Sequence, residues 1–281
     1  MEFKGKTAVV TGSSSGIGKA VAILLAKEGA DIVLAARNLP KMEAVKEEIK
    51  ALGRKAVVIK CDVTDDDSVF NMKDKAIKAF GNIDILINNA AVGVRGLLED
   101  MAMDDWKYVI NTNLIGYIRN VTAFLPHFMK RGSGYIVNVA SIQALAYGTD
   151  MLNTGYITTK AGIIGLTSCL CSTLKLKGIK VSCLIPGGVS TEIGLNTRYV
   201  GTEARKKEML RQYEEFQKMP MFLKPEECAQ GLIDGMKKEE FFILTPPTMA
   251  QMLKGQGVDV DMINAFMANP PPPRMPGPQP K

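Results

Sequence analysis

Residues 7–20 have the sequence TAVVTGSSSGIGKA, and the rest of the predicted fold is arranged around them. The apolar, β-branched first half predicts a buried strand, and the apolar spacing over residues 19–28 predicts a helix. Between the two, Gly12, Gly16 and Gly18 permit a sharp turn, a close approach of the backbone to a phosphate, and tight packing of helix on strand. The free amides at the helix N-terminus then face an anion.

Three other motifs compete for this turn. The spacing Gly-x3-Gly-x-Gly differs from the commoner dinucleotide fingerprint, and a Walker loop fails because it needs glycine at Ser13 and a hydroxyl at Ala20. A hydrolase elbow does fit residues 12–16, with Ser14 as nucleophile. It needs a histidine base, and the chain has one histidine, His127. We interpret His127 as a structural or surface residue, which leaves the hydrolase interpretation without its base.

Composition sets broad limits. With 281 residues, 46% hydrophobic and 23% charged, the chain is long enough for a substantial globular core. The net charge of +6 suits an anionic cofactor, but no basic and aromatic cluster indicates nucleic-acid binding. We expect no membrane span, because we find no apolar run that approaches about 20 residues, and no signal peptide. We therefore expect a cytoplasmic protein. Five cysteines without a C-x-x-C pair predict reduced thiols and no metal site.

Strands and helices alternate along the chain. Strands are expected at residues 7–11, 30–36, 55–61, 83–87, 134–140, 180–185 and 240–244. Helices are expected at residues 19–28, 40–52, 65–80, 106–129 with a possible break, 155–176 and 225–237. Strands this apolar are buried on both faces. The prediction is an α/β, doubly wound, Rossmann-type seven-stranded parallel sheet with helices on both faces and ligands at the carboxyl ends of the strands.

Two segments depart from this alternation. Residues 194–223 form a long insertion, and we predict a lid there, because long connections inside compact domains are usually functional. We expect residues 1–265 to be a single dinucleotide-binding and catalytic domain and residues 266–281 to be a proline-rich C-terminal tail.

Tyr156 and Lys160 stand at positions i and i+4 of a predicted helix, so they share one face. A tyrosine with its ordinary pKa of about 10 is a poor acid or base at neutral pH. A unit charge at about 5 Å in an effective dielectric of about 20 supplies roughly 3 kcal/mol, or about two pKa units. The spacing therefore predicts that Lys160 lowers the pKa of Tyr156.

The order of several motifs resembles the short-chain dehydrogenase/reductase family, of the Tyr-x-x-x-Lys type. The resemblance covers about residues 5–245 and rests on Thr11-Gly12-x3-Gly16-x-Gly18, Asn88-Asn89-Ala90, Asn113, Ser141, Tyr156-x3-Lys160 and Pro186-Gly187. It implies a seven-stranded Rossmann-type sheet, NAD or NADP, and interconversion of alcohols and carbonyls without metal. The separation of Ser141 from Tyr156 is about two residues longer than usual, which suggests a loop shaped to this substrate.

Residue by residue, the resemblance implies that Tyr156 exchanges a proton with the substrate oxygen and that Ser141 holds this oxygen. Lys160 would assist Tyr156 and hydrogen-bond the nicotinamide ribose. Asn113 would fix a water in the proton relay, a role compatible with shaping a helix bend.

The same resemblance implies a set of cofactor contacts. Alanine at position 36 removes the acidic contact typical of NAD-preferring relatives, and the guanidinium of Arg37 can pair with a 2′-phosphate, so we expect NADP, with NAD possible. The cofactor-binding residues are expected to be Gly12, Ser14, Ser15, Gly16, Ile17, Gly18, Arg37, Asp62, Val63, Asn89, Ala90, Tyr156, Lys160, Pro186, Gly187, Val189 and Thr191.

Substrate and assembly are less constrained. We expect an apolar mouth and hence a medium-sized hydrophobic secondary alcohol or ketone. The residues expected at this mouth are Val94, Leu145, Tyr147, Leu152, Met219, Met221 and Phe222. Small residues on the predicted helix at 155–176 suggest a homo-oligomer, a dimer or tetramer, as in relatives. The alternatives are a lyase or isomerase of the same fold, or a non-catalytic NADP-binding scaffold to which the tail docks a partner.

Overall fold

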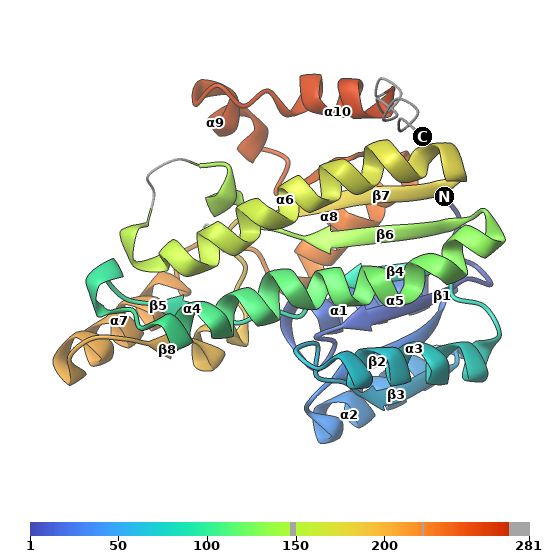
Figure 1. Cartoon of the computed structure of the whole chain (residues 1–281), viewed down its shortest axis with the longest axis horizontal. Helices are drawn as coiled ribbons and strands as arrows, with labels where there is room; N and C mark the ends of the chain where they lie inside the picture. The colour runs from blue at the N-terminus through green and yellow to red at the C-terminus, as the bar shows by residue number, and fades with distance from the viewer. Residues whose placement is uncertain (147–149, 221, 270–281) are drawn as a thin grey trace, which may run out of the picture.

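The computed structural model describes residues 1–146, 150–220 and 222–269 (Figure 1). Within these residues, seven strands form one sheet in the order β3-β2-β1-β4-β6-β7-β9, and every pair is parallel. The strands are β1 (Thr7–Thr11), β2 (Asp31–Ala36), β3 (Ala56–Lys60), β4 (Ile85–Asn88), β6 (Gly134–Val139), β7 (Ile179–Pro186) and β9 (Phe242–Thr245). The predicted doubly wound parallel sheet is confirmed.

Helices cover both faces of this sheet. One apolar core lies between the sheet and α1 (Gly16–Lys27), α2 (Leu39–Ala51) and α8 (Pro225–Lys238). The other lies beneath α3 (Asp66–Phe80), α5 (Gly116–Arg131) and α6 (Thr154–Leu174). Side chains alternate between the two cores along each strand, as the twofold periodicity of a strand requires. Val9 belongs to one core and Val10 to the other, and both are fully buried.

The possible break expected within residues 106–129 is a widened helical turn. α4 (Met103–Ile110) continues through a π-helical turn, Asn111–Ile115, into α5. The chain therefore stays helical through this region, and the π turn displaces the backbone at Asn113 without ending the helix. Gly116, just after the turn, allows α5 to approach Val63, because a Cβ there would lie 3.0 Å from Val63 Cγ2.

The predicted insertion at residues 194–223 is not a plain loop. It contains β8 (Arg198–Tyr199), which pairs in parallel with β5 (Val94–Arg95), and the helix α7 (Glu203–Phe216). Arg205 forms an ion pair with Asp100. The guanidinium of Arg198 lies 3.6 Å from the ring centroid of Tyr108. These contacts fasten the insertion to the segment that follows β4 (Figure 1).

The C-terminal part also differs from its prediction. Two helices that the sequence pattern did not reveal, α9 (Met249–Gly255) and α10 (Val260–Ala268), follow β9. The prediction that the tail begins at residue 266 was wrong for residues 266–268, which complete α10, and residues 270–281 lie outside the described part. Asn264 of α10 accepts a hydrogen bond from Phe242 N and donates one to Phe242 O, which caps the edge of the sheet.

One helical stretch, Met151–Lys177, meets the length and apolarity of a membrane span by composition alone, with a mean hydropathy of 1.3. The expectation that no apolar run approaches this length was therefore wrong. The stretch packs along β7 and also contributes to the apolar core on that face of the sheet, through Ile163 for example. This packing buries 33% of the apolar window.

Candidate active site

The glycine-rich turn after β1 leaves space and donors for an anion. Gly12 and Gly16 have φ of +65° and +54°, a region that disfavours other residues. A Cβ on Gly18 would lie 2.4 Å from both Gly12 O and Asn89 Nδ2, so α1 packs on the turn only with glycine there. Ser15 caps α1 without a side-chain hydrogen bond, which leaves the first amides of the helix for a ligand.

Asn89 and Thr11 tie the carboxyl ends of β4 and β1 together. Asn89 Nδ2 donates to Thr11 O at 2.9 Å, and the backbone amides of Asn89 and Ala90 donate to Thr11 Oγ1 at 3.0 and 3.2 Å. These bonds fix the edge of the sheet on which the glycine turn rests. The predicted positions of Asn89 and Ala90 beside the turn agree with this geometry.

A cleft of about 330 Å³ lies along the carboxyl edge of the sheet, a size typical of ligand sites. It is lined by every residue predicted to bind cofactor except Gly18, which packs behind the turn. Sequence reasoning missed several lining residues, among them Asn38, Lys41, Val92, Thr112, Glu192, Ile193 and Asn196. The glycine cradle, the free helix amides and the exposed guanidinium of Arg37 fit a dinucleotide with its phosphates.

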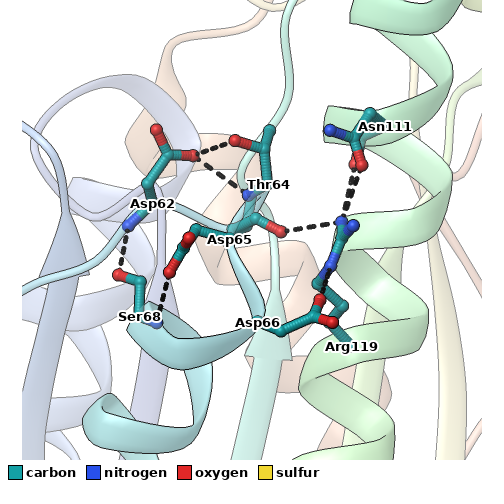
Figure 2. Close-up of polar contacts among 8 residues, drawn as sticks. Asp62, Thr64, Asp65, Asp66, Ser68, Asn111 and Arg119 are labelled. Carbon is teal, nitrogen blue, oxygen red and sulfur yellow. Dashed lines mark hydrogen bonds and ion pairs between the residues drawn. The ribbon is translucent and has the colours of Figure 1, made fainter.

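The loop after β3 forms one wall of this cleft. Figure 2 shows the polar contacts within this loop. Asp62 Oδ1 accepts hydrogen bonds from Thr64 N and Oγ1 at 3.0 and 2.7 Å, and Asp62 N donates to Ser68 Oγ at 2.9 Å. Partial burial opposes ionisation, but the bonds from Thr64 and the charges of Arg37 and Arg119 hold the pKa of Asp62 below its usual value. Asp62 is therefore a fixed carboxylate at neutral pH.

Arg119 of α5 braces the same loop from the neighbouring helix (Figure 2). Its guanidinium donates to Val63 O at 3.3 Å and to Asn111 Oδ1 at 2.8 Å, and it pairs with Asp66 at the start of α3. No local pattern marked Arg119, because two of its partners, Val63 and Asp66, lie more than 50 residues away in the chain. The brace holds Val63 in the wall of the cleft.

Ser141, Tyr156 and Lys160 meet at the cleft, as expected. Ser141 follows β6, whereas Tyr156 and Lys160 lie on α6, and a hydrogen bond links the Ser141 and Tyr156 side chains. Lys160 is fully buried, its Nζ lies 5.4 Å from the Tyr156 ring centroid, and it donates to Val139 O at 2.7 Å. A hydroxyl, a phenol and an amine thus converge where a substrate oxygen can enter.

The pKa of Tyr156 differs from the expectation. Burial raises the pKa of this phenol to about 12, although the hydrogen bond with Ser141 opposes the rise. Burial also lowers the pKa of Lys160 to about 7. The expectation that Lys160 lowers the pKa of Tyr156 assumed that the lysine is fully charged and that the medium is partly polar. Burial makes the surroundings apolar and disfavours the charged lysine, so neither assumption holds.

Tyr117 completes the surroundings of Lys160. Its hydroxyl donates to Val139 O at 3.2 Å, so this carbonyl accepts from both residues. The Lys160 Nζ lies 5.4 Å from the Tyr117 ring centroid. Cys183 of β7 is also buried nearby, and burial raises the pKa of its thiol to about 12. Neither residue belonged to a motif visible in the sequence.

Asn113 does not line the cleft. Its side-chain amide accepts a hydrogen bond from Val92 N at 2.8 Å and donates to Val92 O at 2.9 Å and to Thr159 Oγ1 at 3.2 Å. The side chain thereby anchors the segment after β4 to the π turn and to α6. Its two donors are used in this way, and its place in a proton relay stays a prediction.

His127 of α5 lies away from the glycine turn, beside Ile83 at the amino end of β4. Its Nε2 accepts a hydrogen bond from Ile83 N at 3.1 Å, and burial lowers the pKa of the imidazole. Ile83 precedes the amino end of β4, whereas Ser14 follows the carboxyl end of the neighbouring β1. A hydrolase elbow with this pair of residues is therefore excluded.

Five of the residues expected at an apolar mouth are described by the structure, and these five lie outside the cleft lining. Val94 is fully buried in β5, and Phe222 packs against Gly188 and edge-on against Phe216. Leu145 and Leu152 are half-buried and Met219 is exposed. Tyr147 and Met221 fall outside the described residues.

Comparison with known proteins places these features in a family. The family model described as short chain dehydrogenase matches residues 6–199. The chain belongs to the short-chain dehydrogenase family. A 3-oxoacyl-(acyl-carrier-protein) reductase FabG of Thermotoga maritima is 33% identical over 83% of this chain and 91% of its own length. Glucose 1-dehydrogenase 2 of Bacillus subtilis is 36% identical over 81% of this chain and 86% of its own.

Solved structures of short-chain dehydrogenases agree with the fold. A family member from Burkholderia phymatum in complex with NAD has a TM-score of 0.83 at 27% identity and covers 98% of this chain and 100% of its own. An alcohol dehydrogenase from Thermococcus sibiricus complexed with 5-hydroxy-NADP has a TM-score of 0.69 at 27% identity, covering 83% of this chain and 90% of its own. The chain is therefore an oxidoreductase of the short-chain dehydrogenase family, and the nucleotides bound in these two structures support a nicotinamide cofactor.

Proposed function

We propose that this short-chain dehydrogenase transfers a hydride between NADP(H) and a secondary alcohol or ketone. The observation that carries the proposal is the convergence of Ser141, Tyr156 and Lys160 on the cleft that the glycine turn opens. When bound, the nicotinamide supplies or accepts the hydride. Two residues at the end of β2 support the NADP preference. Ala36 has no carboxylate to bind the adenosine ribose hydroxyls, and Arg37 supplies a guanidinium that can pair with the 2′-phosphate.

The protein side chains handle the proton. In the direction of reduction, the neutral Tyr156 phenol donates its proton to the carbonyl oxygen while a hydride adds to the carbonyl carbon, which gives the alcohol. Ser141 lies next to Tyr156 and orients the same oxygen through its hydroxyl. Lys160, held by a hydrogen bond to Val139 O, is proposed to hydrogen-bond the nicotinamide ribose beside Tyr156.

The substrate is proposed to be medium-sized and hydrophobic. Val92 and Ile193 line the cleft, and the exposed Leu195 follows two residues after Ile193. Apolar walls with a few convergent polar groups are typical of such sites. The insertion at residues 194–223, which follows Ile193 directly and carries α7, is proposed to be a lid over this end of the cleft.

Replacing Tyr156 with Phe tests the proposal. The variant is expected to lose about 10²–10⁴-fold in turnover, because general acid catalysis is removed, while its affinity for NADPH stays within about twofold. Turnover is measured as the change in reduced-nicotinamide absorbance against a panel of ketones and alcohols, with NADP and NAD in parallel. Affinity is measured by fluorescence titration.

Tyr135→Phe is the matched control. Tyr135 is a buried tyrosine that shares a 2.8 Å hydrogen bond with Ser182, and it does not line the cleft. Its removal is expected to leave turnover within about twofold, because no proton transfer depends on it. A Tyr156→Phe variant that keeps a tenth or more of the wild-type turnover contradicts the proposal.

A further inference from the structure

An ion pair closes the outer side of the cleft. Lys41 Nζ of α2 lies 2.5 Å from Glu192 Oε2, and both residues line the cleft. Lys41 follows β2 and Glu192 follows β7, and β1, β4 and β6 lie between these two strands in the sheet. The pair therefore spans the carboxyl edge of the sheet, from the first turn of α2 to the segment after β7.

The segment after β7 also reaches the glycine turn. A Cβ on Gly16 would lie 3.2 Å from Thr191 Cγ2, so Thr191 sits directly against the turn. Glu192 is the next residue, and its carboxylate ends at Lys41. A nucleotide that lies on the glycine turn must therefore pass beneath this pair or displace it.

Two cations stand at the same end of the cleft. Arg37 is exposed, lines the cleft, and has no ion-pair partner in the described part of the chain. Asn38 caps α2 by accepting a hydrogen bond from Lys41 N at 3.0 Å, which fixes the backbone of Lys41 one turn beyond Arg37. Arg37 can therefore bind a ligand without breaking an ion pair, whereas Lys41 can bind one only after its ion pair with Glu192 breaks.

We propose that Lys41 is a second cation for the 2′-phosphate of NADP(H), and that Glu192 is the partner it exchanges for this phosphate. The inference rests on the proposed function, because it concerns the same cofactor. An exposed lysine and glutamate pair contributes little to stability. A phosphate dianion offers more charge and more acceptor oxygens than one carboxylate, so the exchange favours the phosphate.

The exchange makes cofactor choice depend on Glu192 as well as on Arg37. NADH carries no 2′-phosphate, so the Lys41–Glu192 pair stays intact when it binds. With NADPH, Lys41 turns to the phosphate and the freed carboxylate of Glu192 is repelled by it. Glu192 therefore reduces the preference for the phosphorylated cofactor, and Lys41 raises it.

The test measures dissociation constants of NADPH and NADH by nicotinamide fluorescence, for wild type, Lys41→Gln, Glu192→Gln and the double variant. Lys41→Gln is expected to weaken NADPH binding about tenfold, the scale of one charge-assisted contact, and NADH binding by less than about twofold. Glu192→Gln is expected to strengthen NADPH binding about threefold, and this gain is expected to vanish in the double variant.

Lys50→Gln is the matched control, because Lys50 lies on the same helix, pairs with Glu47 within it, and does not line the cleft. It is expected to change neither constant beyond about twofold. Equal weakening of NADPH and NADH by Lys41→Gln, or weaker NADPH binding in Glu192→Gln, overturns the inference and leaves the proposed function standing. Wild type that binds neither nucleotide overturns the proposed function itself.

Discussion

Replacing Lys160 with Met is expected to stabilise the fold at neutral pH. Lys160 is fully buried, and burial lowers its pKa from 10.5 to about 7. The unfolded chain therefore binds this proton more tightly than the folded chain does. By linkage, the difference destabilises the folded protein by on the order of 4 kcal/mol at pH 7 and about 1 kcal/mol at pH 10. The penalty is complete below about pH 7 and disappears as the pH rises through 10.5.

Methionine removes this penalty at a modest structural cost. It is close to lysine in length, and Val139 O keeps the hydrogen bond from Tyr117 at 3.2 Å when the amine is gone. The lost hydrogen bond and imperfect packing cost about 1–2 kcal/mol. The variant is therefore expected to be more stable than wild type by roughly 2–3 kcal/mol at pH 7, and to lose all of this advantage by pH 10.

Equilibrium unfolding in urea at pH 7 and at pH 10, without nucleotide, measures both differences. Lys175→Met is the control, because Lys175 is exposed just beyond α6, and it is expected to change stability by less than about 0.5 kcal/mol at either pH. A Lys160→Met variant that is no more stable than wild type at pH 7 refutes the reasoning. A gain that is equal at pH 7 and pH 10 refutes it as well, since the advantage then has a cause other than the buried charge.

Two further predictions concern the segments around the cleft. Gly18→Ala is expected to destabilise the fold by about 1–3 kcal/mol and to weaken nucleotide binding, because the added Cβ meets Gly12 O. Gly165→Ala is the control: its Cβ enters open space on α6, so this variant is expected to increase the free energy of unfolding by about 0.5–1 kcal/mol. Equal effects of the two alanines in thermal unfolding contradict this prediction. Tyr213→Phe removes a hydroxyl that accepts from Gly194 N at 3.0 Å and donates to Thr191 O at 3.1 Å, so amide exchange over residues 191–197 is expected to accelerate about tenfold. Unchanged exchange there shows that α7 does not hold this segment.

Local chemistry explains how much of the site was predictable. Strand, turn and helix around Gly12 and Gly18 follow from short-range backbone geometry, and the i, i+4 spacing of Tyr156 and Lys160 survives any tertiary arrangement that keeps α6 helical. Contacts between distant segments leave no such trace. Lys41 and Glu192 are 151 residues apart, and only the order of strands in the sheet brings them together.

Irregular elements were harder to predict for a related reason. Residues 198–199 form a strand only because β5 lies beside them, and two residues carry no periodicity of their own. The π turn at Asn111–Ile115 likewise depends on Asn113, whose amide binds the main chain of Val92 on another segment. In both places the partner, and not the local sequence, selects the conformation.

The protonation of Tyr156 and Lys160 shows what burial adds to this account. A charged lysine beside a phenol favours ionisation of the phenol, but here burial raises the pKa of Tyr156 to about 12 and lowers that of Lys160 to about 7. Both changes disfavour the pair of charges, because a low-dielectric interior solvates neither ion. Near neutral pH the phenol therefore keeps its proton. A neutral phenol is the form that donates to a carbonyl oxygen, so the side chains of the site alone favour reduction of a ketone, and oxidation of an alcohol requires the phenolate and is expected to need higher pH.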